Sequence, residues 1–322
     1  MPSKRFAFYA WSVLAFQLAV ILWGAFVRAS GSGNGCGQHW PLCNGQIVPT
    51  TPLNATMIEF GHRVTSGIAL VSVCVLAIWA FRAFPQGYGV RGGAALALLS
   101  TLTECAIGAA LVLLRLVGSD ESLARGLWLG AHLINTLFLL AALSITAWRA
   151  TIVHRSTQLL RPPWVVWLSV ARFLGAGILG TFAALGDTLT VSTSVTEGLR
   201  ADFSAFSNIF VRLRVLHPIA AGALGAWLLV LAFRVSASKH STARAKRLGI
   251  TIAGLVLFQF AIGIANIVLL TPVSLQLLHL LTADLVWIAF VLLGESLMVA
   301  SNTPILVFDS ALLAVTKKHS IP

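Results

Sequence analysis

Charged residues are scarce in this chain. Only 10% of its 322 residues are Asp, Glu, Lys or Arg, whereas 57% are hydrophobic. A water-soluble domain carries roughly 25% charged residues, because its surface has to be hydrated. The shortage excludes an ordinary soluble protein, and the sequence predicts an all-α, polytopic membrane protein.

Acidic residues are scarcer than basic ones: there are 10 acidic and 22 basic residues, which gives a net charge of +12. Such an excess could indicate nucleic-acid binding, but the Lys and Arg residues lie between apolar runs and form no basic stripe. We therefore expect no nucleic-acid partner. No small-residue cleavage site follows the first apolar run and no transit peptide is evident, so we expect a prokaryotic plasma membrane, the inner membrane of a bacterium.

Eight apolar runs are long enough to cross a bilayer, which needs about 20 residues of helix. The runs cover residues 8–27, 58–81, 92–114, 126–148, 164–186, 209–233, 247–270 and 274–299. The connections after the second, fourth and sixth runs, together with the two termini, hold 14 of the 22 basic residues. Because basic residues concentrate on the inner side of a membrane, both termini are expected to be cytoplasmic.

The two halves of the chain are similar to each other. Residues 106–114 start with Ala-Ile-Gly, and the same tripeptide starts residues 261–270, which lie 155 positions later. A repeat of this kind indicates a duplicated structural unit. The sequence therefore predicts two pseudo-symmetric four-helix bundles, an N-terminal domain (1–150) and a C-terminal domain (151–322).

Four histidines occupy corresponding places in this repeat, near the exterior start of an even-numbered span. The shift of 155 positions carries His62 to His217, and His132 is matched by His279 after a shorter loop. Ionisable residues inside a membrane are costly and usually functional. Two facing histidines can ligate both sides of a haem iron, so we predict haem ligation by both pairs, against the alternatives of hydrogen-bonded core histidines or a proton relay.

Glu59 lies three residues before His62, about one helical turn away on the same face. It could transfer a proton or stabilise a developing cation at a haem edge. Alternatively, Glu59 could have only a structural role, as a carboxylate stabilised by the positive end of the helix dipole. Because the corresponding residue in the second half is Arg214, we expect the reaction in the first half and a fixed cofactor in the second.

Cysteine is rare, and two of the four cysteines, Cys36 and Cys43, lie in the long first exterior loop (28–57). A disulfide is expected on the oxidising side of the membrane. The bond could clip the Gly-rich loop, or it could exchange with a thiol–disulfide partner. The spacing does not separate these roles, although a loop beside a haem edge favours the redox role.

Five further charged residues lie at membrane depth or at its boundary. Arg28, Arg63 and Arg214 could pair with haem propionates, since Arg suits carboxylates, or could act as interfacial anchors. Glu104 and Asp284 are intramembrane acids, for which the sequence suggests only interhelical hydrogen bonding or a proton path.

Together these residues resemble the haem A synthase family, in the bacterial form with a cysteine pair in the first exterior loop. The resemblance rests on the eight spans, the Cys-x6-Cys loop, the Glu-x-x-His-Arg element at 59–63 and the four histidines. It implies an oxidoreductase that converts a methyl group of haem O to the formyl group of haem A for terminal oxidases. Haem O synthase is then the expected donor of the substrate.

The resemblance also implies roles for single residues. Haem b would be held by His217 and His279, the substrate haem would lie near His62 and His132, and Glu59 would be required for catalysis. The loop cysteines matter for activity in such relatives. Some carry a second cysteine pair between spans five and six, but residues 187–208 contain no cysteine, so a mechanism needing both pairs loses support here.

Two other functions fit the same residues. A bis-histidine membrane cytochrome of the b type would pass electrons between quinol and another carrier. A haem transporter or assembly scaffold would bind and release the same ligand unchanged. Glu59, which has no counterpart in the second half, favours the enzyme over both.

Overall fold

The secondary-structure elements of the described residues are all α-helices, as expected. The computed structural model describes residues 4–50, 54–151 and 164–300, and eight membrane-length apolar helices lie in these ranges, which confirms a multi-pass membrane protein. The helices are α1 (Lys4–Ala29), α2 (Asn54–Ala83), α3 (Gly89–Leu113), α4 (Leu123–Thr151), α5 (Trp164–Leu189), α6 (Val195–Asp202), α7 (Ile209–Leu213), α8 (Leu216–Ala237), α9 (Ala243–Val268) and α10 (Val273–Ala300).

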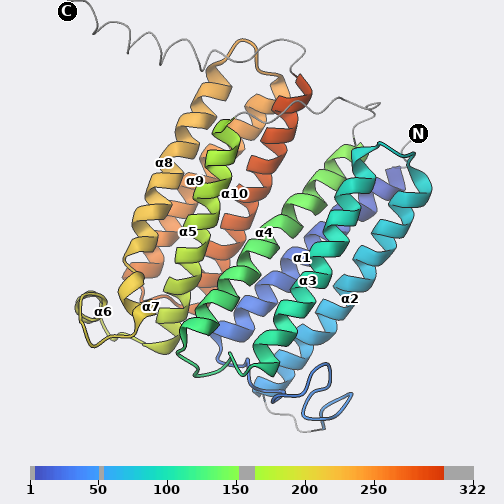
Figure 1. Ribbon diagram of the computed structural model, residues 1–322. Helices are drawn as coiled ribbons and strands as arrows, with labels where there is room; N and C mark the ends of the chain where they lie inside the picture. The colour runs from blue at the N-terminus through green and yellow to red at the C-terminus, as the bar shows by residue number, and fades with distance from the viewer. Residues whose placement is uncertain (1–3, 51–53, 152–163, 301–322) are drawn as a thin grey trace, which may run out of the picture.

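The long helices form two neighbouring groups (Figure 1). In the first, α1, α2, α3 and α4 pack in sequence and α4 returns to α1; in the second, α5 packs on α8, α8 on α9, and α9 on α10. α4 also packs on both α5 and α10, so it joins the groups. The division into two pseudo-symmetric domains stays a prediction.

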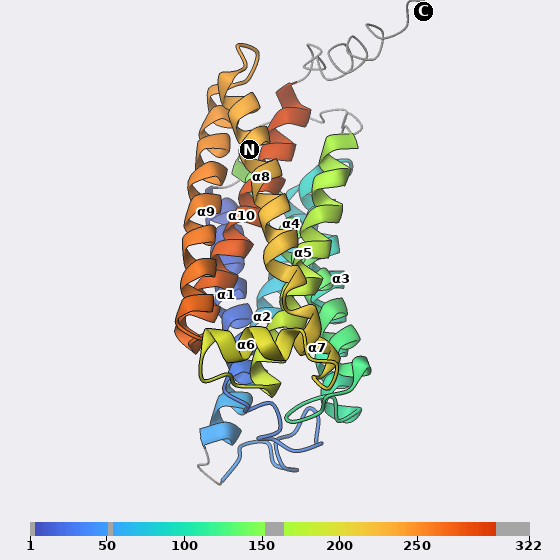
Figure 2. The ribbon, with the colours of Figure 1, turned by 90° about the vertical axis from the view of Figure 1, so that its left-hand side faces the viewer.

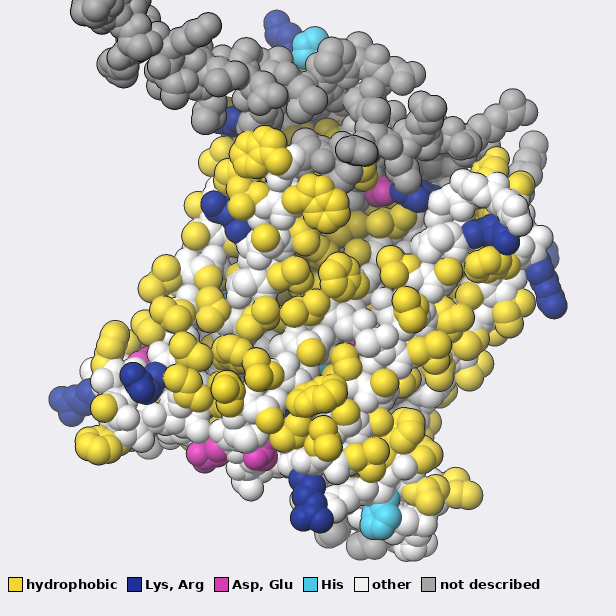
Figure 3. Space-filling model, in the orientation of Figure 1, with side chains coloured by type: hydrophobic (Ala, Val, Ile, Leu, Met, Phe, Trp, Pro, Cys, Tyr) yellow, Lys and Arg dark blue, Asp and Glu magenta, His cyan; other side chains and the backbone are white. Residues whose placement is uncertain are grey.

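The two ends of the molecule differ. α1 begins and α10 ends at one end, which we call the terminal end (Figure 1). The cysteine loop and α6 lie at the opposite end, which we call the loop end (Figure 2). On the face drawn in Figure 3, hydrophobic side chains cover the flanks of the helices between these ends. That distribution suits a helix bundle surrounded by lipid.

The helices extend beyond the apolar runs that predicted them. α1 continues to Ala29 and α2 has begun by Asn54, so Arg28 and Met57 are helical and the first loop is shorter than residues 28–57. An apolar run ends at its first polar residues, whereas the backbone hydrogen bonds of a helix can continue through them. This difference places Glu59 well inside α2 instead of at its start.

A short helix, α6, lies within the connection at 187–208 that was predicted as a loop. Ser194 caps it, accepting a hydrogen bond from the backbone N–H of Glu197 at 3.2 Å. Glu197 in turn accepts from the backbone N–H of Thr193 at 2.8 Å, and hydrogen bonds from Thr193 lower the pKa of the Glu197 carboxyl. A Ser-x-x-Glu pattern is the usual start of a helix, so this signal was present in the sequence.

The predicted sixth span (209–233) is divided into α7 and α8 at Arg214 and Val215. Pro218 explains the break. It has no N–H to donate to the carbonyl of Arg214 four residues earlier, and its ring crowds that carbonyl. His217 donates to the Arg214 carbonyl instead, at 3.2 Å, and thereby stands at the start of α8.

Two buried polar contacts join the groups of helices. Arg149 on α4 makes a bidentate ion pair with Glu295 on α10, with N–O distances of 2.8 and 2.7 Å. The indole N–H of Trp287 on α10 donates to the carbonyl of Leu137 on α4 at 2.8 Å. α4 and α10 are therefore held together by specific contacts as well as by apolar packing.

Replacing Arg149 by Leu is expected to lower the midpoint of thermal unfolding in detergent. Glu295 is buried and would lose the cation that pairs with it. Breaking a buried pair costs about 3–5 kcal/mol, whereas replacing both partners by apolar residues is close to neutral. The Arg149→Leu/Glu295→Leu variant is the control, and it should recover most of the lost stability. Equal melting of the single variant and the parent would contradict the prediction.

Candidate functional site

All four predicted ligand histidines lie toward the loop end and are half-buried. His62 is on α2, His132 on α4, His217 at the start of α8 and His279 on α10. Each lies within about three turns of the loop end of its span. The structure therefore places the four imidazoles at similar depth, two in each group of helices.

The second pair has the separation that a shared metal requires. The ring centres of His217 and His279 are 6.2 Å apart and their planes are inclined by 81°. Imidazole–metal bonds of about 2.0 Å on opposite sides of one ion put two ring centres roughly 6 Å apart. His217 Nδ1 lies 3.1 Å from the carbonyl of Ala176, so Nδ1 carries the proton and Nε2 is left free to coordinate. The residues present thus fit a bis-histidine haem iron.

Three of the histidine rings lie against glycines of neighbouring helices. A Cβ atom added to Gly24 would come within 2.9 Å of the His62 ring, and one added to Gly180 within 2.9 Å of the His217 ring. A Cβ on Gly263 would approach the His279 ring to 3.3 Å. These glycines leave the space that lets the rings point inward between the helices.

Nδ1 of His62 and Nδ1 of His279 are both buried and have no protein hydrogen-bond partner among the described residues. A buried polar atom usually has a partner, because leaving it without one costs about 1–3 kcal/mol. A hydrogen-bonded core histidine would have partners for these atoms, so the orphaned nitrogens count against that alternative.

The fourth histidine has a different environment. Nδ1 of His132 makes a close ion-pair contact with Oε2 of Glu104 on α3. The other oxygen of Glu104 accepts a hydrogen bond from the hydroxyl of Thr136 at 2.8 Å. Glu104, which had no evident partner in the sequence, is therefore part of the first histidine pair's surroundings.

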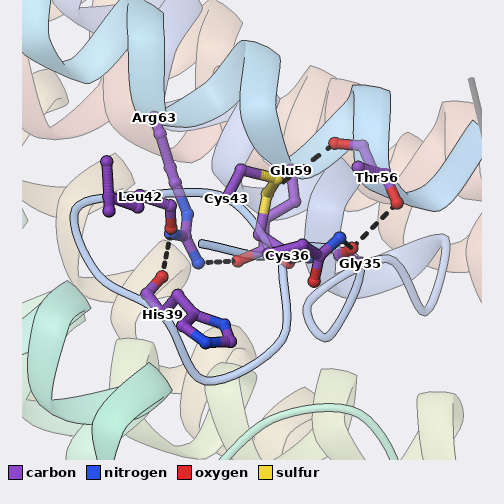
Figure 4. Close-up of polar contacts among 9 residues, drawn as sticks. Gly35, Cys36, His39, Leu42, Cys43, Thr56, Glu59 and Arg63 are labelled. Carbon is purple, nitrogen blue, oxygen red and sulfur yellow. Dashed lines mark hydrogen bonds and ion pairs between the residues drawn. A yellow bond between two sulfur atoms is a disulfide. The ribbon is translucent and has the colours of Figure 1, made fainter. Parts of the chain in front are cut away.

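Glu59 is buried, with 4% of its surface exposed, and binds the cysteine loop (Figure 4). Its Oε2 accepts a hydrogen bond from the backbone N–H of Cys36 at 2.8 Å. Its Oε1 accepts from Arg63, one turn further along α2, at 2.5 Å. The carboxylate is thus held between a cation on its own helix and the backbone of the loop.

Arg63 extends the same contact to the rest of the loop (Figure 4). Its guanidinium donates to the carbonyls of His39 at 2.5 Å and Leu42 at 2.6 Å. Thr56 donates its hydroxyl to the carbonyl of Gly35 at 2.8 Å. The loop therefore folds over the start of α2, directly above Glu59.

The predicted disulfide between Cys36 and Cys43 is confirmed. Both cysteines are almost completely buried, with 0% and 1% of their surface exposed. Thiol–disulfide exchange requires that a thiolate reach one of the sulfur atoms. Burial therefore favours the clip over exchange with a partner while the loop is docked.

The predicted propionate-binding arginines all have protein acceptors. Arg63 is used as described above. Arg28 on α1 reaches the second group of helices, where it donates to the carbonyl of Ala184 and the hydroxyl of Thr188, both at 2.7 Å, and to Gln276 at 3.3 Å. The assignment of either arginine to a propionate stays a prediction.

Arg214 lies between two carboxylates. It contacts Asp187 at 2.7 Å and Asp202 at 2.7 Å, and so ties the end of α5 to α6. Its pairing with a propionate likewise stays a prediction. Neither aspartate was recognised from the sequence as a partner, because both fall in the connection whose folding was not predicted.

Of the two intramembrane acids, Glu104 has side-chain partners, whereas one carboxyl oxygen of Asp284 has none among the described residues. The repeat that matched the histidines also aligns Glu104 with Gln259, a signal that could have pointed to Glu104. Asp284 is buried, and its Oδ2 has no partner among the described residues. Its role is not explained by the contacts around it.

Known proteins are similar to this chain in sequence. Residues 7–291 match the profile of the COX15-CtaA family, described as cytochrome oxidase assembly protein. A heme A synthase of Exiguobacterium sibiricum is 27% identical over 256 residues, which are 75% of this chain and 79% of that protein. A heme A synthase of Geobacillus kaustophilus is 39% identical over 133 residues, 41% of each chain.

A further relative carries another name. A protein of Thermus thermophilus named protoheme IX farnesyltransferase is 43% identical over 299 residues, which are 91% of this chain and 48% of the relative. The chain therefore spans about half the length of that curated relative. The family profile covers most of the described helices and all four histidines. The chain belongs to the COX15-CtaA family, the haem A synthase family of oxidoreductases.

Proposed function

We propose that this chain oxidises a methyl group of haem O to the formyl group of haem A. One observation carries the proposal: buried Glu59 lies one turn from His62, whereas the second pair of histidines has Arg214 at the corresponding place. Two similar histidine pairs, with a carboxylate beside one and a guanidinium at the aligned place beside the other, suit two different tasks. The first half would hold the substrate and the second half a permanent cofactor.

The residues divide accordingly. His217 and His279 would hold haem b, which would supply a one-electron carrier beside the substrate site. His62 and His132 would orient the iron of the substrate haem. Glu59 would accept a proton released as the methyl carbon is oxidised, or stabilise positive charge developing there. The docked cysteine loop would keep bulk water away from that carboxylate.

The name of the Thermus relative suggests prenyl transfer as another activity. Prenyl diphosphates require Mg²⁺ held by carboxylates. In this chain most of the acids within or beside the described spans are in contact with basic side chains; the pairs are Glu59 with Arg63, Glu104 with His132, Asp187 and Asp202 with Arg214, and Glu295 with Arg149. This chain matches only about half of that relative, so the name of the whole relative does not assign prenyl transfer to it.

The distribution of charge supports one orientation of the chain in the membrane. The loop end would face the outside of a bacterial inner membrane, and both termini the cytoplasm, because the basic residues concentrate at the terminal end. Haem O synthase would deliver the substrate. A thiol–disulfide partner would reach Cys36 and Cys43 only after the loop had left Glu59.

The identity of the bound pigments tests the proposal. The protein is purified from membranes that contain haem O synthase, and its haems are extracted and identified. We expect haem B together with haem O, haem A or a hydroxylated intermediate. Haem B alone would instead support an electron-transfer cytochrome. Haem O recovered unchanged after incubation with an electron acceptor would support a transporter or scaffold.

Replacing Gly180 by Ala is expected to displace the His217 ring, because the added methyl group would lie within 2.9 Å of it. Binding of haem at the second site should weaken. The measurements are the amount of haem B per protein and the absorption bands of the haem that remains bound. Gly175→Ala on the same helix is the matched control, since its Cβ would meet nothing within 4 Å. Equal haem content in both variants would contradict the prediction.

A further inference from the structure

We propose that Glu104 is a positioning residue that fixes His132 and makes the first haem site more electron-rich than the second. This inference rests on the proposed function, because it concerns the iron that His62 and His132 would share. It adds a second carboxylate to the first half, acting through a ligand and not on the methyl group itself.

The contacts around Glu104 determine the state of His132. Oε2 of Glu104 meets Nδ1 of His132, and a carboxylate at this place favours the tautomer with the proton on Nδ1, which leaves Nε2 as the coordinating atom. Thr136 fixes the carboxylate by donating its hydroxyl to Oε1 at 2.8 Å. That hydroxyl also lies 2.9 Å from the carbonyl of His132, which ties the three residues together.

The His132 ring contacts a charged side chain, whereas the rings of the other three histidines lie against glycines. Gly108 on α3 corresponds in the repeat to Gly263, which lies against His279. A Cβ on Gly108 would meet nothing within 4 Å among the described residues. The His132 ring is therefore oriented by Glu104 rather than by steric contact with this glycine.

The second half lacks the corresponding pair. Gln259 stands at the place of Glu104, and its Oε1 is buried without a partner among the described residues. Nδ1 of His279 is also buried without one. The aligned positions thus hold a carboxylate in contact with Nδ1 of a histidine in the first half and a neutral amide that makes no hydrogen bond to that nitrogen in the second.

This difference has an electronic consequence. A carboxylate on the outer nitrogen of a ligating histidine raises the basicity of the ligand and favours the more oxidised metal. His217 has only the neutral carbonyl of Ala176 in that place. The first site should therefore release electrons more readily than the second, which is the direction that oxidation of a substrate haem requires.

The test exchanges the two aligned side chains in the haem-loaded protein. Glu104→Gln should shift the midpoint potential of the first-site haem to a more positive value and weaken haem binding there about 10- to 100-fold. Gln259→Glu should shift only the second-site haem, to a more negative value. His132→Ala and His279→Ala identify which spectral component belongs to each site.

Two further variants separate charge from shape. Thr136→Val removes a hydrogen bond but keeps the carboxylate, so it should move the first-site potential less than Glu104→Gln does. Should Glu104→Gln lose the first haem altogether, Glu104→Asp, which keeps the charge, should restore it. The hydrogen bond from Asn135 to the carbonyl of Ser100, at 2.8 Å, still joins α4 to α3 in each of these variants.

The outcomes separate the inference from the proposed function. An unchanged first-site potential in Glu104→Gln, or a lost haem that Glu104→Asp fails to restore, overturns the role of Glu104. A parent protein whose haem content does not depend on His62 or His132 overturns the proposed substrate site instead. A shift of the second-site haem in Glu104→Gln equal to that of the first would also exclude a local effect.

Discussion

A Glu59→Gln variant is expected to bind both haems and to lose formation of the formyl product by about 10²- to 10⁴-fold, the usual contribution of a positioned proton acceptor. Glutamine has the shape of glutamate and can still accept the hydrogen bond from Cys36, but it carries no charge and cannot take up a proton. The measurement is conversion of haem O in purified protein, with haem content determined in parallel.

Docking of the loop has to be followed in the same variant, because Glu59 also holds Cys36 and Arg63. The rate at which a soluble reductant opens the buried disulfide reports on docking. Glu121→Gln is the matched control, since Glu121 is an exposed carboxylate near the same end of the molecule. Normal conversion by Glu59→Gln would remove the catalytic role, and rapid reduction of its disulfide would assign the loss to undocking.

Replacing His279 by Ala should have the second large effect. One of the two proposed axial ligands would be lost, so the affinity of the second site for haem B should fall by more than about 100-fold, beyond the usual effect of losing an outer partner of a ligand. Product formation should fall with it, because electrons from the substrate would have no neighbouring carrier. The measurements are haem stoichiometry and turnover.

His240→Ala provides the comparison for this prediction. His240 is exposed in the turn between α8 and α9, at the opposite end of the second group of helices. Its replacement should change neither haem content nor turnover. Two haems retained in His279→Ala would show that His279 is not a ligand, and turnover retained after loss of haem B would show that the second haem is not needed.

The sequence was sufficient for the spans, the depth of the histidines and the disulfide. Hydropathy determines which residues lie in lipid, and therefore the level at which His62 and His279 lie. It does not determine how far each helix is rotated about its axis, which decides which side chains meet. The contact of Glu104 with His132 depends on that rotation and could not be predicted.

The contacts at the loop end could not be predicted from the sequence either. Arg214 meets Asp187 and Asp202 because α6 returns the chain to the end of α5, and an apolar run gives no information on such a return. The hydrogen bond from Cys36 to Glu59 depends likewise on how a Gly-rich loop folds. By contrast, α6 and the break at Pro218 had local signals that the pattern of apolar runs obscured.

The position of α4 limits how halves of related proteins could be exchanged. α4 carries His132 of the first histidine pair while it packs on α5 and α10 of the other group, where Arg149 binds Glu295. Arg28 crosses in the same direction from α1. A chimera that took only its C-terminal half from a relative would need matching partners for both arginines. Grafting α4 and α10 as a unit is therefore a sounder design than joining halves at residue 150.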